Sequence, residues 1–160
     1  MKKQAIIYAS VHHGNTEKLI TEAAKTLQIE LFKVKQAESI DFSRYSSVGF
    51  ASGIYAGRFH KSIFKFIDNY QSSLPKTTFT VCTSGVGKGW FARRFSAYLR
   101  KKGFVVLGEF ECKGFDTFGP FKLFGGFAKG HPDSRDIKNC IAFFQNFVNT
   151  SQPEPTEINF

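Results

Sequence analysis

Short apolar runs alternate with segments of helical periodicity along most of the chain, and this alternation constrains the fold more than any other feature. Apolar, β-branched and aromatic residues run together, as in strands, at 3–10, 29–34, 47–52, 77–83 and 104–112. Four other segments carry apolar residues three or four positions apart, which is the period of a buried helix face. These segments begin at Thr16, Ile63, Phe91 and Asp133 or Ser134. The pattern predicts an α/β fold in which right-handed crossovers place helices on both faces of a doubly wound parallel sheet.

The chain has 160 residues, which fits one hydrophobic core. We expect a domain at 1–150 and a flexible tail at 151–160, where the sequence is polar and contains proline. No stretch approaches the ~18 apolar residues that would span a bilayer. The first apolar run is also too short for a signal peptide.

The cysteines Cys82, Cys112 and Cys140 form no CxxC pair and are odd in number. Free cysteines of this kind are typical of small core residues in a reducing compartment, so the sequence predicts a cytoplasmic protein. We assign the cysteines no chemistry.

Basic residues outnumber acidic ones by 22 to 13, which gives a net charge of +9. This charge favours an acidic partner protein or peripheral contact with an anionic membrane. The basic residues are scattered, apart from 93–94 and 100–102, so we find no local nucleic-acid module and expect no nucleic-acid partner.

Ligands of doubly wound sheets bind outside the carboxyl ends of the strands. The predicted strands therefore direct attention to four loops, at 10–16, 52–60, 83–90 and 112–132. Any cofactor is expected to lie among them.

The first of these loops, Ser10-Val11-His12-His13-Gly14-Asn15-Thr16, is rich in hydrogen-bond donors and leads directly into a helix. A helix N-terminus carries a partial positive charge and free N–H groups, so this loop predicts an anion site. It lacks both the Walker lysine and the three-glycine dinucleotide fingerprint. A monophosphate fits it better than a triphosphate or a dinucleotide.

The ending Gly14-Asn15-Thr16 resembles the phosphate loop of the flavodoxin family. The resemblance implies a three-layer fold with five parallel strands in the order 2-1-3-4-5, and one bound FMN. His12 and His13 depart from the Thr-Gly sequence usual at these positions. Carried over by position, the phosphate ligands would be Ser10, His12, His13, Gly14, Asn15 and Thr16.

Two further loops resemble the family's ring-binding loops. In the first, Tyr55 would flank the flavin, or Ile54 if the alignment shifts by one residue, and Ala56 or Gly57 would supply a peptide group to the reduced ring. In the second, Trp90 would stack on the ring. The residues that the resemblance places at the ring are Ser52, Gly53, Ile54, Tyr55 and Ala56, then Thr83, Ser84, Gly85, Val86, Gly87 and Trp90.

The resemblance implies an FMN-dependent electron carrier that works between redox partners with acidic surfaces, as a monomer or a homodimer. We assign no catalytic residue and no metal ligand. The segment 53–60 is also similar to the corresponding loop of quinone-dependent protoporphyrinogen oxidases, so an FMN-dependent oxidoreductase remains the alternative. We expect the phenylalanines Phe118, Phe121, Phe124 and Phe127 to cap the core or a partner surface.

Overall fold

Five parallel strands form the centre of the computed structural model, which describes residues 3–117 and 119–148. Their order in the sheet is β2-β1-β3-β5-β6. Numbered among themselves, they have the predicted order 2-1-3-4-5. The strands are β1 (Lys3–Ala9), β2 (Glu30–Lys33), β3 (Tyr45–Tyr55), β5 (Thr77–Ser84) and β6 (Val105–Lys113), and the two-residue β4 (Arg58–Phe59) pairs antiparallel with β3.

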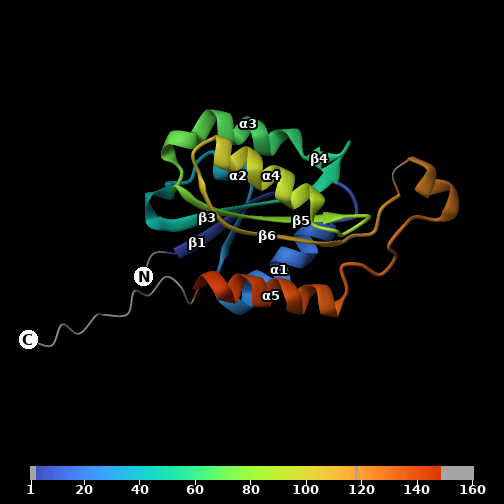
Figure 1. The fold of residues 1–160 in the computed structure, drawn as a ribbon. Coiled ribbons are helices and arrows are strands. Elements are labelled where there is room, and N and C mark those ends of the chain that lie inside the picture. Colours follow the sequence, from blue (N-terminus) through green and yellow to red (C-terminus); the bar gives the residue numbers. More distant parts are fainter. Residues whose placement is uncertain (1–2, 118, 149–160) are drawn as a thin grey trace, which may run out of the picture.

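Helices cover both faces of this sheet, which confirms the predicted doubly wound fold. Figure 1 shows α1 (Asn15–Leu27) and α5 (Ser134–Val148) on one face. The other face carries α2 (Val34–Ala37), α3 (Lys61–Tyr70) and α4 (Trp90–Lys101). Short 3₁₀ turns occupy Phe42–Arg44, Gln71–Ser73 and Gly119–Phe124.

Each face of the sheet has its own aromatic-rich core. On the α3 and α4 side, the rings of Phe59 and Phe95 stack with centroids 3.9 Å apart. On the α1 and α5 side, Phe79 packs against Phe144. Gly49 in β3 is required by this packing, since a Cβ there would lie 2.2 Å from the ring of Phe79. Burial of each large apolar side chain contributes about 1.5–3 kcal/mol to folding.

The loop after β3 is a tight hairpin, which the sequence pattern did not predict. Ala56 and Gly57 both have positive φ, 50° and 78°, as in two-residue hairpin turns. They reverse the chain so that Phe59 pairs with Ile54 and buries its ring. This buried ring explains why a two-residue strand forms.

Cys82, Cys112 and Cys140 are free and buried. Burial raises the pKa of all three thiols, so they are packed as small apolar residues. Within residues 3–117 and 119–148, no helix combines the length and apolarity needed to cross a membrane. The predicted tail at 151–160 lies outside the described residues.

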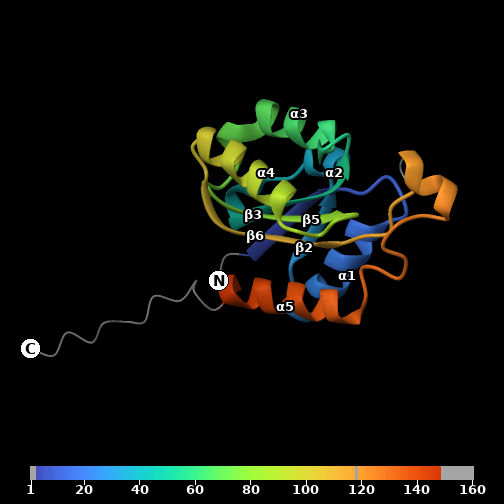
Figure 2. The ribbon, with the colours of Figure 1, turned by 45° about the vertical axis from the view of Figure 1, so that its right-hand side comes forward.

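The connection between β6 and α5 extends beyond the sheet. Its 3₁₀ turn, drawn in orange, stands away from both helical layers in Figures 1 and 2. It lies at the end of the sheet where the parallel strands finish. The chain then returns to α5 through residues 125–133.

Candidate functional site

A cleft of about 720 Å³ opens at the carboxyl ends of β1, β3 and β5. Ligand sites of this type usually measure ~300–1,000 Å³. The structure therefore brings together the loops that the sequence singled out. Predicted site residues that line the cleft are Ser10, His12, His13, Asn15, Thr16, Gly53, Ile54, Tyr55, Ala56, Thr83, Ser84, Gly85 and Val86.

The first loop presents its backbone N–H groups at the start of α1. His13 and Gly14 have positive φ, 56° and 64°, which turns the chain into the helix. The N–H of Val11 donates to Tyr55 Oη at 2.8 Å, and that of Glu17 donates to Ser10 Oγ at 3.3 Å. In the described part of the chain, the N–H groups of residues 12–16 have no protein acceptor. A row of unpaired amides at a helix N-terminus favours an anion.

Two polar side chains of the first loop form hydrogen bonds with neighbouring elements. Thr16 is buried, and its Oγ1 lies 2.8 Å from Thr83 Oγ1. Asn15 donates from Nδ2 to the carbonyl of Phe115 at 2.7 Å. Both side chains fasten the loop to the sheet and to the last connection. The backbone N–H groups of both residues have no protein acceptor in the described part of the chain, so they remain available to a ligand.

The hairpin after β3 forms a second wall. The ring of Tyr55 lies 5.6 Å from that of His12 and 5.1 Å from that of His60, centroid to centroid. A Cβ on Gly53 would lie 3.1 Å from Tyr55 Oη, so the glycine lets the tyrosine fold back over the strand. Ser52, also predicted as a ligand, is fully buried. Its hydroxyl accepts from the N–H of His60 at 2.9 Å and donates to the Gly53 carbonyl at 2.6 Å.

A carboxylate holds the loop after β5 in place. Glu111 accepts from Ser84 Oγ at 2.7 Å, and its other oxygen accepts from the N–H groups of Phe91 and Ala92 at 3.0 and 3.1 Å. Ser84 in turn accepts from the N–H of Gly87 at 2.8 Å. Gly87 does not line the cleft. A Cβ at this position would lie 2.7 Å from the backbone nitrogen of Lys113. No local sequence pattern indicated this role of Glu111.

Trp90 lies apart from the cleft lining. It is the first residue of α4, its side chain is 54% exposed, and the amine of Lys88 lies 5.3 Å from its ring centroid. The aromatic residues that line the cleft are instead Tyr55, Phe91, Phe115 and Phe127. The predicted phosphate-loop residue Gly14 does not line the cleft either; it forms the bend before α1.

The connection after β6 supplies a third wall, whose individual residues the sequence analysis did not assign. His13 Nε2 lies 2.8 Å from Thr117 Oγ1, and the rings of His13 and Phe115 have centroids 4.7 Å apart. Asp116 and Phe127 pair through two backbone hydrogen bonds of 2.8 and 2.6 Å. Only the position of this connection could have indicated these residues, because the connection follows a strand at the ligand-binding edge of the sheet. Lining residues from it are Gly114, Phe115, Asp116, Thr117, Lys122 and Phe127.

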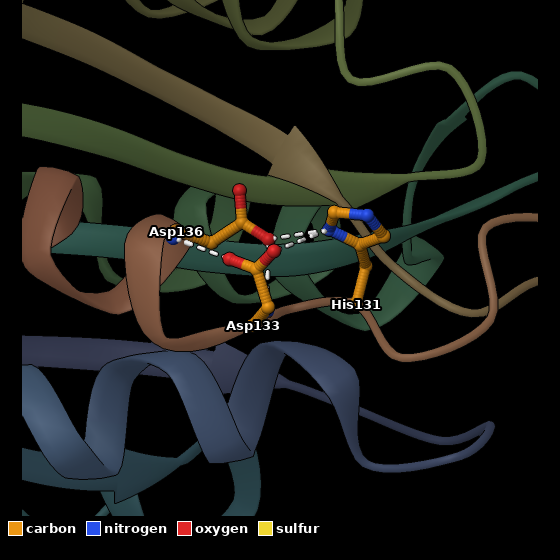
Figure 3. A group of neighbouring side chains, drawn as sticks. All are labelled: His131, Asp133 and Asp136. Carbon is orange, nitrogen blue, oxygen red and sulfur yellow. Dashed lines mark hydrogen bonds and ion pairs between the residues drawn. The ribbon is translucent and has the colours of Figure 1, made fainter.

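His131, Asp133 and Asp136 form a cluster where this connection enters α5, and Figure 3 shows their side chains converging. Asp133 Oδ1 accepts from the N–H groups of Arg135 and Asp136 at 2.9 Å. Asp136 Oδ2 accepts from the N–H of Asp133 at 2.9 Å and lies 2.7 Å from His131 Nδ1. The donated N–H bonds lower the pKa of the Asp133 carboxyl. This reciprocal capping box explains the helix start, as predicted from Asp133 or Ser134.

Four glycine-containing loops, a helix N-terminus and a parallel sheet now define the site, and known proteins share this arrangement. A family model described as a flavodoxin domain matches residues 5–114. The chain belongs to the flavodoxin family. Flavodoxins and related proteins bind ligands at the edge of the sheet where this cleft lies.

Relatives of this flavodoxin-family protein extend over most of its length. An uncharacterised protein of Methanocaldococcus jannaschii is 41% identical over 148 residues, which cover 91% of this chain and 98% of that protein. Among solved structures, a flavodoxin from the domain Archaea has a TM-score of 0.67 at 12% identity, covering 92% of this chain and 97% of that one.

Two other solved structures are similar in fold. A flavoprotein of Lactobacillus acidophilus in complex with FMN has a TM-score of 0.57 at 17% identity, covering 70% of this chain and 94% of that one. Rubredoxin oxygen:oxidoreductase of Desulfovibrio gigas has a TM-score of 0.68 at 14% identity, and the match covers 94% of this chain but 36% of the enzyme.

Proposed function

We propose that the cleft binds one FMN and that the protein carries electrons between redox partners. The observation that carries this proposal is the first loop, whose N–H groups at residues 12–16 have no acceptor at the start of α1 among the residues that the structure describes. Membership of the flavodoxin family and the FMN named for the Lactobacillus acidophilus flavoprotein support the choice of ligand.

The first loop would hold the phosphate of FMN. The backbone N–H groups of residues 12–16 are its donors, and the α1 N-terminus adds a partial positive charge. The hydrogen bonds of Thr16 and Asn15 to neighbouring elements keep these amides in one arrangement. Little reorganisation is then needed when the anion binds.

The two glycine-containing loops would hold the flavin ring. Tyr55 supplies an aromatic face on one side, and the Ala56–Gly57 turn offers a peptide group at the ring edge. Residues 84–86 form the opposite side, fixed by Ser84 and Glu111. Bound FMN would supply one- or two-electron transfer. The protein's part is to exclude water and to place hydrogen-bond donors at the polar edge of the ring.

The proposed partners are redox proteins with acidic surfaces, because the chain carries a net charge of +9. Opposite charge would speed the encounter of carrier and partner and make its rate fall as salt rises. A carrier also needs no general base or nucleophile of its own.

The experiment that tests the carrier role is a reductive titration of the FMN-loaded protein, followed by mixing with one-electron and two-electron acceptors. A carrier passes electrons singly to an acceptor protein and does not oxidise a porphyrinogen. Rapid porphyrinogen oxidation with a quinone as acceptor would contradict the carrier role and establish the oxidoreductase alternative.

A further inference from the structure

Two neighbouring apolar side chains in the 3₁₀ turn of the connection after β6 are almost fully exposed. Leu123 is 85% exposed and Phe124 is 83% exposed, the highest values among the large apolar residues whose exposure the structure describes. We call this pair the tip. It belongs to the 3₁₀ turn Gly119–Phe124, which stands clear of both helical layers in Figures 1 and 2. The tip is therefore a convex apolar projection.

The chain on either side of the tip is basic. The segment 117–132 contains Lys122 and Lys129 and no acidic residue. A Cβ on Gly125 would lie 3.3 Å from Lys129 Nζ, which places this ammonium group beside the turn that ends the tip. An apolar projection with ammonium groups next to it matches the acyl and headgroup regions of an anionic bilayer.

The base of the projection is fixed to the rest of the protein. Asp116 and Phe127 close it through their paired backbone hydrogen bonds, and the N–H of Phe115 donates to the carbonyl of His131 at 3.0 Å. His13 holds Thr117 from the first loop. The projection thus emerges from an ordered base, and Lys122 and Phe127 connect it to the cleft lining.

We propose that the tip inserts into the surface of an anionic lipid bilayer and holds the mouth of the cleft beside it. A fluid apolar phase accepts a convex pair of side chains without a preformed pocket. A second copy of the chain fits less well, because both copies would bring the same positive charge to the contact. The inference goes beyond the proposed function and does not depend on bound flavin.

Vesicle co-sedimentation tests this inference with four proteins, each with and without added FMN. The proteins are the natural chain, the double variant Leu123→Ser/Phe124→Ser, the single variant Lys129→Gln, and a matched control, Val105→Ser/Leu107→Ser. The control removes two apolar side chains, 60% and 44% exposed, from the edge strand β6. The vesicles are phosphatidylcholine alone and an equimolar mixture with phosphatidylglycerol, and thermal unfolding checks that each variant is folded.

The natural chain and the control should bind the mixed vesicles, and the tip variant should bind them at least about tenfold more weakly. Pure phosphatidylcholine should bind the natural chain more weakly than the mixture does, and Lys129→Gln should weaken binding to the mixture. Equal binding by the tip variant and the natural chain would mean that charge alone causes vesicle binding. This result would overturn the proposed insertion of the tip. Failure to bind mixed vesicles, equal binding to both lipids, or a dimer that only the tip variant abolishes would also overturn it.

Discussion

Thr16 Oγ1 and Thr83 Oγ1 lie 2.8 Å apart, and both threonines are buried. Thr16 lies in the first turn of α1, and Thr83 lies near the end of β5. The hydrogen bond therefore joins the first loop, which we propose binds the phosphate, to the strand before the second proposed ring loop.

Thr83→Val keeps the side-chain shape and leaves the buried hydroxyl of Thr16 without this partner. We expect it to lower the free energy of unfolding by about 1–3 kcal/mol, measured by urea denaturation of the FMN-free protein. Thr16→Val/Thr83→Val should lose less than the sum of the two single changes, because no hydroxyl is then stranded. Ser39→Ala, at an exposed hydroxyl bonded to the Gln36 carbonyl, is the control and should change stability by less than about 0.5 kcal/mol. Simple additivity of the threonine changes would show that the pair is not coupled.

Gly114→Ala should weaken FMN binding. A Cβ at this position would lie 3.0 Å from both Asn15 Nδ2 and Thr83 Cβ, so it would push the first loop away from its place. We expect the dissociation constant for FMN to rise by about tenfold or more, since a misplaced amide loses its hydrogen bond to the phosphate. Gly108→Ala is a matched control, with a Cβ 3.1 Å from the rings of Phe143 and Phe147 and away from the cleft lining. Equal losses of affinity in both variants would mean that the effect is general destabilisation.

Stability should fall on mild acidification, and His60 should account for part of the fall. Burial, followed by the charges of Lys61 and His12, lowers the pKa of His60 in the folded protein. The unfolded chain then takes up a proton more readily, so stability is lost as pH falls through about 6.5 and below. His60→Asn can still cap α3 through its carbonyl oxygen and should flatten the dependence of unfolding free energy on pH. Identical pH profiles for the variant and the natural chain would contradict this assignment.

Salt should change the reduction potential of the bound flavin. The net charge of +9 would stabilise an anionic, fully reduced flavin bound in the cleft and would raise its second reduction potential. Added salt screens this attraction, so the second potential should become more negative as ionic strength rises. Spectroelectrochemical titration at low and high salt measures the change, with free FMN as the reference. A low potential that salt does not alter would rule out the charge effect.

The sequence allowed the strands and the main helices to be predicted because their apolar patterns are local, whereas the order of the strands in the sheet was predicted from the resemblance to the flavodoxin family. The run 47–52 and the helical period after Thr16 predict β3 and α1 without any knowledge of tertiary contacts. The β3–β4 hairpin is different. Its formation depends on Phe59 being buried beneath α4, which is a long-range contact.

Residues of the candidate site could be predicted where their position along the chain places them at the ligand-binding edge of the sheet. Residues that long-range packing brings to the site could not be predicted. His12 and Val86 line the cleft because the loops that carry them follow the ends of β1 and β5. The contact of His13 with Thr117 joins residues more than a hundred positions apart, so no local pattern could predict it. The same holds for Glu111, whose carboxylate reaches the N-terminus of α4 from the neighbouring strand.

The most direct test of the cofactor assignment is a titration of flavin-free protein with FMN and, separately, with riboflavin, followed by flavin fluorescence and absorption. We expect one FMN to bind per chain and riboflavin to bind much more weakly, because the first loop would contribute to binding only through the phosphate. Absence of FMN binding by the folded protein, or equal affinity for both flavins, would contradict the cofactor assignment.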